Sequence, residues 1–210
     1  MSQVDQPRGE IFIVDDDQGV RDALTIVFTN AGHTVRAFAD GASFVAAARA
    51  EKKPACIILD VHMPGRSGLD ILKALNAEQY PAPIFIISGQ GDIPMAVDAI
   101  RNGALDFIEK PFNGESVVTS VREAIDAWTR RKESGGSEGL SMQFPGHDLL
   151  TPREREVLGK IAGGASNKEA GRQLGISPRT IEVHRARIME KLGAKNAADL
   201  VRIVLSEGRR

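Results

Sequence analysis

Three acidic side chains, one hydroxyl and one ammonium each follow a short apolar stretch, and together they could carry out phosphoryl chemistry. They are Asp15 and Asp16 after 10–14, Asp60 after 56–59, Ser88 after 84–87 and Lys110 after 105–108. Short, unbroken apolar runs that stop at a turn are typical of strands buried on both faces of a parallel sheet. Because the carboxyl ends of parallel strands lie at one edge of the sheet, the five side chains are predicted to line a single cleft.

Three carboxylates in one cleft would repel one another strongly unless a cation lay among them. Mg²⁺ suits such a site because it needs few protein oxygens and keeps several of its waters. On the other side of the cleft, the Ser88 hydroxyl and the Lys110 ammonium would suit the spare oxygens of a phosphoryl group. The predicted chemistry is therefore transfer of a phosphoryl group onto a carboxylate. Taken alone, Asp60 could equally begin the turn at Pro64–Gly65.

The elements that must position these side chains alternate between strand and helix. Strands are predicted at 10–14, 33–38, 56–60, 84–87 and 105–108, and helices near 18–32, 41–50, 68–76, 95–103 and 114–131. Right-handed crossovers between parallel strands place the helices on both faces of the sheet. Residues 1–131 are therefore predicted to form a doubly wound α/β domain with a five-stranded parallel sheet.

Residues 150–210 carry helix-start signals in place of strand patterns. Three pairs of residues show the chemistry that begins a helix, namely Thr151 with Glu154, Ser166 with Glu169, and Ser177 with Pro178. Two short helices joined at Gly175, the second rich in cations, are typical of a helix-turn-helix motif. With a fourth amphipathic helix near 196–206, this segment is predicted to be an all-α, four-helix domain.

The segment between these domains, residues 132–149, is predicted to be a flexible linker. Its SGGSEG run at 134–139 has the composition of a flexible chain. Leu140, Met142 and Phe144 alternate with polar residues, so part of the segment could pack on a domain.

Charge is divided unevenly along the chain. Residues 1–150 carry 14 Lys+Arg and 21 Asp+Glu, a net charge of −7, whereas 151–210 carry 13 and 7, a net charge of +6. This division suggests that only the second part meets nucleic acid. The single Cys56 lies in an apolar stretch, which excludes a disulfide framework and indicates a reducing compartment. No run is long enough to span a bilayer and the polar start is not a signal peptide, so we expect a cytoplasmic protein without membrane contact.

The third helix of the all-α domain carries side chains that could bind DNA. Its exposed positions are predicted to be Arg179, Thr180, Glu182, Val183, Arg185, Ala186, Arg187 and Lys191. The arginines and lysine would neutralise phosphates, Glu182 could accept from cytosine, and Val183 could contact a thymine methyl group. A basic helix face is often simply solvated, but the basic excess and the helix-turn-helix pattern favour DNA.

Residues 10–130 resemble response-regulator receiver domains, through VDDD at 14–17, LDVHMPG at 59–65, ISG at 87–89 and EKPF at 109–112. The resemblance implies that Asp60 accepts a phosphoryl group from a sensor histidine kinase. It also implies that Asp16, Asp60 and the backbone carbonyl of His62 bind Mg²⁺ directly, whereas Asp15 acts through water. Ser88 and Lys110 would contact the phosphoryl oxygens, and the bond from Lys110 to Pro111 is expected to be cis.

The same resemblance implies a switch formed by Ser88 and Phe107. Phe107 matches the aromatic residue that swings inward on activation, although the family often has Thr at the first position and sometimes Tyr at the second. Because Phe has no hydroxyl, this switch would be read by packing; alternatively, Phe107 is a plain core aromatic. Dimerisation through the helix near 95–103 and the strand after it is the family's common route.

Residues 150–210 are similar to LuxR-type output domains of the NarL/FixJ family. The similarity lies in LTPRE at 150–154, SNKEAGRQLGIS at 166–177 and RTIEVHRARIMEKL at 179–192. It implies DNA-backbone contacts by Lys168, Arg179, Thr180, His184, Arg185, Arg187 and Lys191, with Glu182, Val183 and Ala186 nearer the bases. The last helix is this family's dimer contact. His184 could instead be a histidine packed inside the domain.

These observations predict a two-component response regulator, not an enzyme acting on an external substrate. Phosphorylation of Asp60 would favour a homodimer that binds a palindromic promoter site on double-stranded DNA. An aspartyl-phosphate enzyme would need an acid two residues after Asp60, and position 62 is His. The remaining alternative is a constitutive DNA-binding regulator whose receiver serves only as a dimer scaffold.

Overall fold

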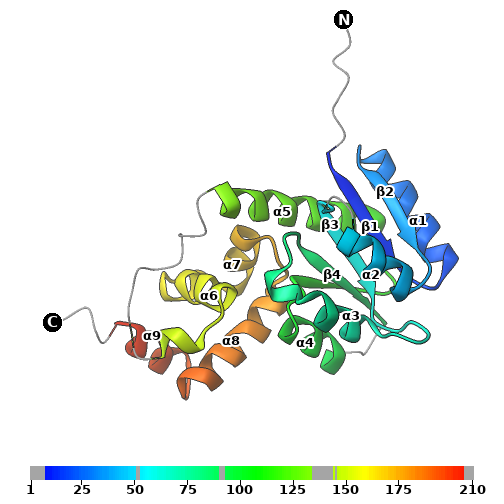
Figure 1. Ribbon diagram of the computed structural model, residues 1–210. Coiled ribbons are helices and arrows are strands. Elements are labelled where there is room, and N and C mark those ends of the chain that lie inside the picture. Colours follow the sequence, from blue (N-terminus) through cyan, green and yellow to red (C-terminus); the bar gives the residue numbers. More distant parts are fainter. Residues whose placement is uncertain (1–7, 51–52, 90–92, 134–143, 145, 206–210) are drawn as a thin grey trace, which may run out of the picture. The chain divides into compact units, whose positions relative to one another are not determined.

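Five parallel strands form one sheet in the computed structural model of this chain, in the order β2-β1-β3-β4-β5 (Figure 1). The strands are β1 (Glu10–Val14), β2 (Thr34–Phe38), β3 (Cys56–Asp60), β4 (Ile84–Ser88) and β5 (Asp106–Glu109). The structure describes residues 8–50, 53–89, 93–133, 144 and 146–205. They belong to two units, Met1–Ile125 and Asp126–Arg210, and the sheet lies in the first. The predicted five-stranded parallel sheet is confirmed.

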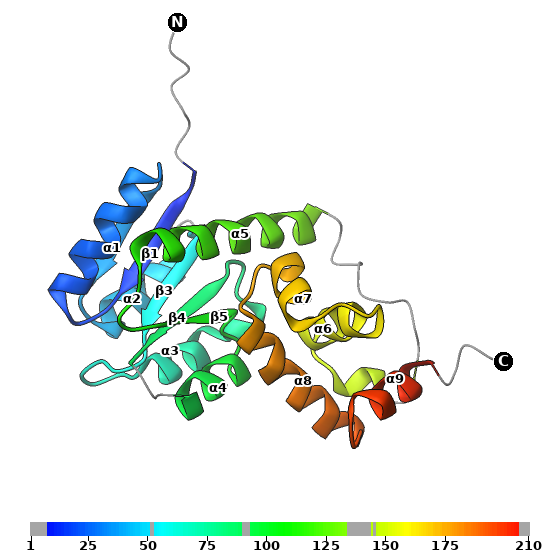
Figure 2. The ribbon, with the colours of Figure 1, turned by 180° about the vertical axis from the view of Figure 1, so that it is seen from behind.

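Helices cover both faces of this sheet. They are α1 (Gln18–Asn30), α2 (Gly41–Ala50), α3 (Gly68–Leu75), α4 (Ile93–Arg101) and α5 (Gly114–Glu133), with a short 3₁₀ turn, η1 (Ala77–Gln79). Helices α1 and α5 lie on one face, and α2, α3 and α4 lie on the other (Figures 1 and 2). This layering follows from right-handed crossovers between parallel strands.

The core of the first unit lies where the apolar runs predicted it. All five residues of β3 and all five of β4 are buried, as expected for central strands covered on both faces. Three aromatic rings, Phe12, Phe38 and Phe44, pack edge to face with centroids 5.3 to 6.4 Å apart. These contacts hold β1, β2 and α2 together beneath the carboxyl edge of the sheet.

After the end of α5, the described residues of the second unit form a 3₁₀ turn and four helices. They are η2 (His147–Leu149), α6 (Pro152–Ala162), α7 (Asn167–Leu174), α8 (Pro178–Leu192) and α9 (Ala197–Leu205). Both predicted capping boxes are present, because Thr151 and Ser166 each accept from the backbone of a glutamate three residues later and that glutamate reaches back. Ser177 caps α8, and Pro178 occupies its first turn. The four-helix prediction is confirmed.

The predicted linker over 132–149 is described only at its ends. Residues 132–133 belong to α5, and His147–Leu149 form η2. Phe144 is buried and packs edge to face on His147, with ring centroids 5.5 Å apart. Leu140 and Met142 lie outside the described residues. The end of the segment is therefore packed and belongs to the second unit. The domain boundary at 150 stays a prediction.

None of the described helices is long and apolar enough to cross a lipid bilayer.

Candidate functional site

Asp15, Asp60 and Lys110 meet at the carboxyl edge of the sheet. The Lys110 Nζ lies 2.8 Å from Asp60 Oδ1 and 3.0 Å from Asp15 Oδ2. Both carboxylates are buried, since Asp15 is 0% and Asp60 is 3% exposed. One ammonium therefore bridges two carboxylates that have almost no contact with solvent.

The charges in this cluster do not balance. Burial raises the pKa of Asp60 above its usual value; the hydrogen bond from Lys110 opposes this rise, and the charge of Asp15 adds to it. Burial alone would lower the pKa of Lys110, but its hydrogen bonds to Asp60 and Asp15 raise that pKa. Lys110 thus remains an ammonium while Asp60 stays short of positive charge, which favours a further cation or an electrophile beside it.

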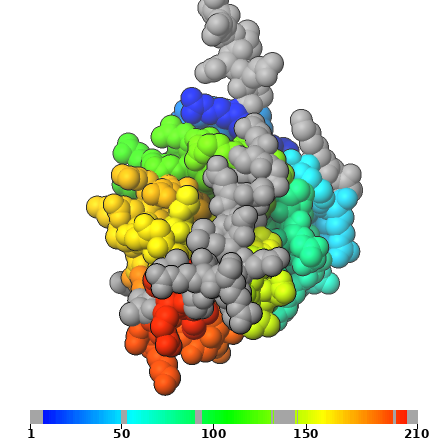
Figure 3. Space-filling model, turned by 90° about the vertical axis from the view of Figure 1, so that its left-hand side faces the viewer, coloured from blue at the N-terminus to red at the C-terminus, as the bar shows by residue number. Residues whose placement is uncertain are grey.

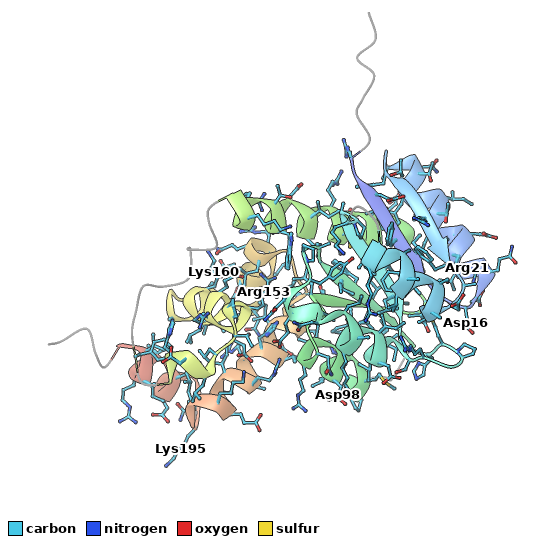
Figure 4. All side chains as sticks on the ribbon, in the orientation of Figure 1. Asp16, Arg21, Asp98, Arg153, Lys160 and Lys195 are labelled. Carbon is cyan, nitrogen blue, oxygen red and sulfur yellow. The ribbon has the colours of Figure 1, made fainter. Side chains whose placement is uncertain are left out.

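Asp15 is held in place by its own loop. Its Oδ1 accepts from the Asp17 backbone N–H at 2.9 Å, and its carbonyl oxygen accepts from the Arg21 guanidinium at 2.7 Å. Asp17 also caps α1 by accepting from Gly19 and Val20. Figure 4 labels Arg21 and the neighbouring Asp16 at this end of the unit. We did not predict Arg21 from the sequence, although a cation in the first turns after three aspartates was a usable signal.

A glycine lets the connection after β3 pass close to Asp60. The Gly68 N–H donates to the Val61 carbonyl at 2.9 Å, and Gly68 begins α3. A Cβ atom at this position would clash with the Asp60 carbonyl oxygen and the Val61 backbone. Any larger residue here would therefore displace the chain that carries Asp60.

The predicted magnesium ligands are only partly gathered. Asp60 lies buried beside Asp15, but Asp16 and His62 are exposed. Across the part of the chain that the structure describes, no three His, Cys, Asp or Glu side chains form a group that could hold a metal ion. The predicted ligand set also includes the His62 backbone carbonyl and a water-mediated contact by Asp15, so the magnesium site stays a prediction. The donor set itself suits Mg²⁺, which prefers carboxylate and carbonyl oxygens.

Ser88 and Phe107 lie on β4 and β5, the two strands that follow β3 in the sheet. Ser88 is 3% exposed at the end of β4, and its carbonyl oxygen accepts from the Lys110 backbone N–H at 2.7 Å. Phe107 lies beside Ile86 in the β4–β5 register and is half-buried, so it is not a fully buried core residue. The peptide bond between Lys110 and Pro111 is cis, as expected. The five predicted cleft residues thus all follow or end strands at one edge of the sheet, and Asp16 is the exposed one among its three aspartates.

Helices α7 and α8 form a helix-turn-helix. Helix α7 ends at Gly175, which has a left-handed conformation, and α8 begins directly after Ser177. Gly171 permits the tight turn, since a Cβ there would lie 2.6 Å from the Ile176 carbonyl oxygen. In Figure 3 the yellow and orange atoms of α6, α7 and α8 form part of the visible surface of this unit.

Two of the predicted DNA contacts are buried inside the second unit. Thr180 is 0% and His184 is 4% exposed. The Thr180 hydroxyl shares a hydrogen bond with the Ser177 hydroxyl at 2.9 Å, so it belongs to the helix cap. Neither His184 ring nitrogen has a hydrogen-bond partner among the described residues, and burial lowers its pKa to about 3. The prediction that Thr180 is exposed is wrong, and His184 is the packed histidine of the alternative interpretation.

The remaining predicted contacts divide by exposure. Lys168, Glu182 and Ala186 are exposed, whereas Arg179, Val183, Arg185, Arg187 and Lys191 are half-buried.

Three cations of α8 contact other helices of the same unit. Arg185 donates to the Asn167 side chain at 2.7 Å, and that amide also donates to Glu182 at 3.2 Å. Lys191 Nζ lies 2.7 Å from Glu154 Oε2, and Arg187 Nε lies 3.6 Å from Glu154 Oε1. Our sequence interpretation assigned Glu154 only to a helix cap, and it gave Asn167 no role.

Comparisons with known proteins match both units. Residues 11–122 match the response regulator receiver domain family, and residues 148–204 match the luxR family of bacterial regulatory proteins. The chain is 38% identical over 202 residues to the transcriptional regulatory protein FixJ of Bradyrhizobium diazoefficiens, covering 96% of this chain and 97% of FixJ. It is 39% identical over 200 residues to the C4-dicarboxylate transport transcriptional regulatory protein DctR of Rhodobacter capsulatus, covering 92% and 98%.

A solved structure is similar over the same length. The crystal structure of full-length FixJ from B. japonicum shares 37% sequence identity, covers 96% of this chain and 98% of its own, and gives a TM-score of 0.58. The chain therefore belongs to the response regulators of the NarL/FixJ family, in which a receiver domain precedes a LuxR-type domain.

Proposed function

We propose that this protein accepts a phosphoryl group on Asp60 from a sensor histidine kinase and thereby controls transcription through its LuxR-type domain. The observation that carries this proposal is the buried pair of Asp15 and Asp60 bridged by Lys110. The relatives support it, since FixJ and DctR are both named transcriptional regulatory proteins.

In the proposed transfer, an Asp60 carboxylate oxygen attacks the phosphorus of the donor. A new P–O bond forms as the P–N bond to the kinase histidine breaks, and the electron pair of that bond stays on the imidazole nitrogen. Lys110, already 2.8 Å from Asp60, is placed to neutralise charge on the phosphoryl oxygens. The Ser88 hydroxyl, at the end of the neighbouring strand, would contact the same oxygens.

Mg²⁺ is the cation that suits the carboxylate surplus of this cleft. Asp16, Asp60 and the backbone carbonyl of His62 would hold it, with Asp15 acting through a water molecule. Bound there, it would supply charge neutralisation at the transferred group. Burial and the charge of Asp15 raise the pKa of Asp60 despite its hydrogen bond from Lys110, and a further cation beside it would favour its ionised form.

The signal would pass from Asp60 to the DNA-binding unit through Ser88 and Phe107. Phe107 is half-buried and carries no hydroxyl, so an inward movement would be read as a change in packing on β5. The phosphorylated protein would form a homodimer on a palindromic double-stranded site. Lys168, Arg179 and Arg185 would contact phosphates, and Glu182, Val183 and Ala186 would contact base edges.

The first test is labelling of the full chain with acetyl phosphate in the presence of Mg²⁺. We expect Asp60→Asn to abolish the acid-stable, base-labile label, because the amide cannot act as the acceptor. Asp98→Asn is the matched control, since Asp98 is an exposed aspartate of α4 that pairs with Arg101 at 3.5 Å. Unchanged labelling of the Asp60 variant would overturn the assigned acceptor.

A further inference from the structure

A buried carboxylate links the first helix of the LuxR-type unit to its DNA-reading helix. Glu154 of α6 is 0% exposed, and its Oε2 accepts from Lys191 Nζ at 2.7 Å. Its Oε1 lies 3.6 Å from Arg187 Nε. The same carboxylate completes the capping box by accepting from the Thr151 backbone N–H at 2.8 Å. Glu154 therefore joins a helix start to two cations of another helix.

The charges of this cluster keep Glu154 ionised. Burial alone would raise the pKa of Glu154, but the hydrogen bonds from Lys191 and Thr151 and the charge of Arg187 lower it. The Oε2 atom of this buried carboxylate is hydrogen-bonded, whereas Oε1 has no hydrogen-bond partner among the described residues and has only the Arg187 charge 3.6 Å away. Loss of the two cations would leave a buried charge uncompensated. We therefore expect these ion pairs to stay formed in the folded domain, unlike ion pairs on the surface.

Helical geometry places both cations on the inward face of α8. At about 100° per residue, Arg187 and Lys191 share the side of the helix that carries Thr180 and His184, which are buried. Glu182 and Ala186 lie on the other side and are exposed. The side-chain exposure of Arg187 is 16% and that of Lys191 is 29%. Two cations of the basic helix therefore face the domain interior.

We infer that Glu154 is a positioning residue that holds α8 through Arg187 and Lys191, and that these two cations do not contact DNA phosphates. The inference rests on the proposed DNA binding and changes which cations contact the phosphates. Phosphate contacts come instead from cations such as Lys168, which is exposed on α7. Arg187 and Lys191 fix the orientation in which Glu182, Val183 and Ala186 are presented.

The first experiment measures amide hydrogen exchange in the full-length protein without DNA. Glu154→Gln keeps a side chain that can serve the capping box but removes the charge facing α8. We expect exchange over 178–192 to become about tenfold faster or more, since one member of a buried ion cluster is lost. Unchanged exchange there would overturn the proposed role of Glu154.

Glu169→Gln is the matched control for that variant. Glu169 occupies the same capping-box position on α7, where it accepts from the Ser166 backbone and hydroxyl, and it is exposed. We expect wild-type exchange over 178–192 in this variant. Equal acceleration in both variants would show that the loss lies in the cap, and it would overturn the ionic role.

The second experiment measures the salt dependence of binding to a short mixed-sequence DNA duplex. Each lost phosphate contact lowers the steepness of log K against log[salt] by about 0.9. We expect that reduction for Lys168→Gln and no change in slope for Lys191→Gln or Arg187→Gln, whatever their affinity. A reduced slope in either of the latter variants would overturn the inference for that cation. If the wild-type protein fails to bind any duplex, the proposed DNA binding fails, and the exchange experiment still decides the role of Glu154.

Discussion

The two units of this protein each bury a small ionic cluster, and the clusters have opposite balances of charge. In the receiver, two carboxylates share one ammonium, as Asp15 and Asp60 both contact Lys110. In the LuxR-type unit, one carboxylate has two cations, as Glu154 faces Arg187 and Lys191. The pKa of the central carboxylate is raised in the first cluster and lowered in the second.

This difference separates a reactive site from a structural one. Asp60 has little positive charge around it, so binding a cation beside it would be favourable, and the added negative charge of a phosphoryl group would need that cation as well as Lys110. Glu154 already has more positive charge than it needs, so nothing further has to bind. Burial of a carboxylate therefore does not by itself indicate its role. The number of positive charges around it separates the two cases.

The largest expected effect comes from removing the one ammonium of the receiver cluster. Lys110→Ala leaves Asp15 and Asp60 unpaired and deprives the transferred group of a positive neighbour. We expect the rate of labelling by acetyl phosphate to fall by about 100-fold, as when one donor that stabilises a developing charge is removed. Lys73→Ala, which removes an exposed lysine of α3, should label at the wild-type rate. Wild-type labelling of the Lys110 variant would show that the cluster is structural.

The pH dependence of stability tests the packing of the LuxR-type unit. Burial, together with the charges of Arg153 and Arg187, lowers the pKa of His184 from 6.5 to about 3. Between these values the unfolded chain binds a proton that the folded chain does not, so stability falls as the pH falls below 6.5. We expect a loss of about 2 kcal/mol between about pH 7 and pH 5.

The pH experiment uses urea denaturation with pulse hydrogen exchange, followed on peptides of α6 and α8. His184→Gln cannot take up the proton, so its stability should change less over the same pH range. Equal pH dependence of the variant and the wild type would contradict the burial of a neutral His184.

A smaller effect, on stability, is expected when one negative charge is removed from the receiver cluster. Asp60→Asn should stabilise the metal-free receiver, because burial and the charge of Asp15 raise the pKa of Asp60 and so disfavour its ionised form. Because the pKa of Asp60 is raised on folding, the stability it contributes is lost as the pH rises through that folded value. The gain should therefore be larger at neutral pH than near pH 4, in urea denaturation with EDTA. A destabilised variant at neutral pH would mean that the contact with Lys110 stabilises the Asp60 carboxylate by more than burial and Asp15 destabilise it.

The sequence predicted the receiver cleft well because strand ends carry the information locally. The apolar run of β3 ends at Asp60, and parallel pairing with β1 and β4 brings the other strand ends to the same edge. The capping boxes at Thr151 and Ser166 were predicted for the same reason, since both partners lie within four residues.

The surface of α8, which we propose reads DNA, was predicted less well because its polar residues were taken to be exposed. Thr180 and His184 are polar, yet they lie on the buried side of α8. Arg187 and Lys191 both pair with Glu154, which lies more than thirty residues earlier in the chain on another helix. Only the packing of α6 against α8 brings these groups together, and no local pattern could show it. The receiver has a similar case in Asp16. It is exposed, although Asp15 beside it in the VDDD motif is buried, and the motif alone did not predict this difference.

The most direct test of the account locates the phosphoryl group on the chain. The full-length protein is incubated with acetyl phosphate and Mg²⁺, treated with borohydride to reduce the acyl phosphate to an alcohol, and analysed by peptide mass spectrometry. We predict homoserine at position 60 and nowhere else. Homoserine at position 15 or 16, with Asp60 intact, would contradict the claim that the carboxylate bridged by Lys110 at the end of β3 is the acceptor.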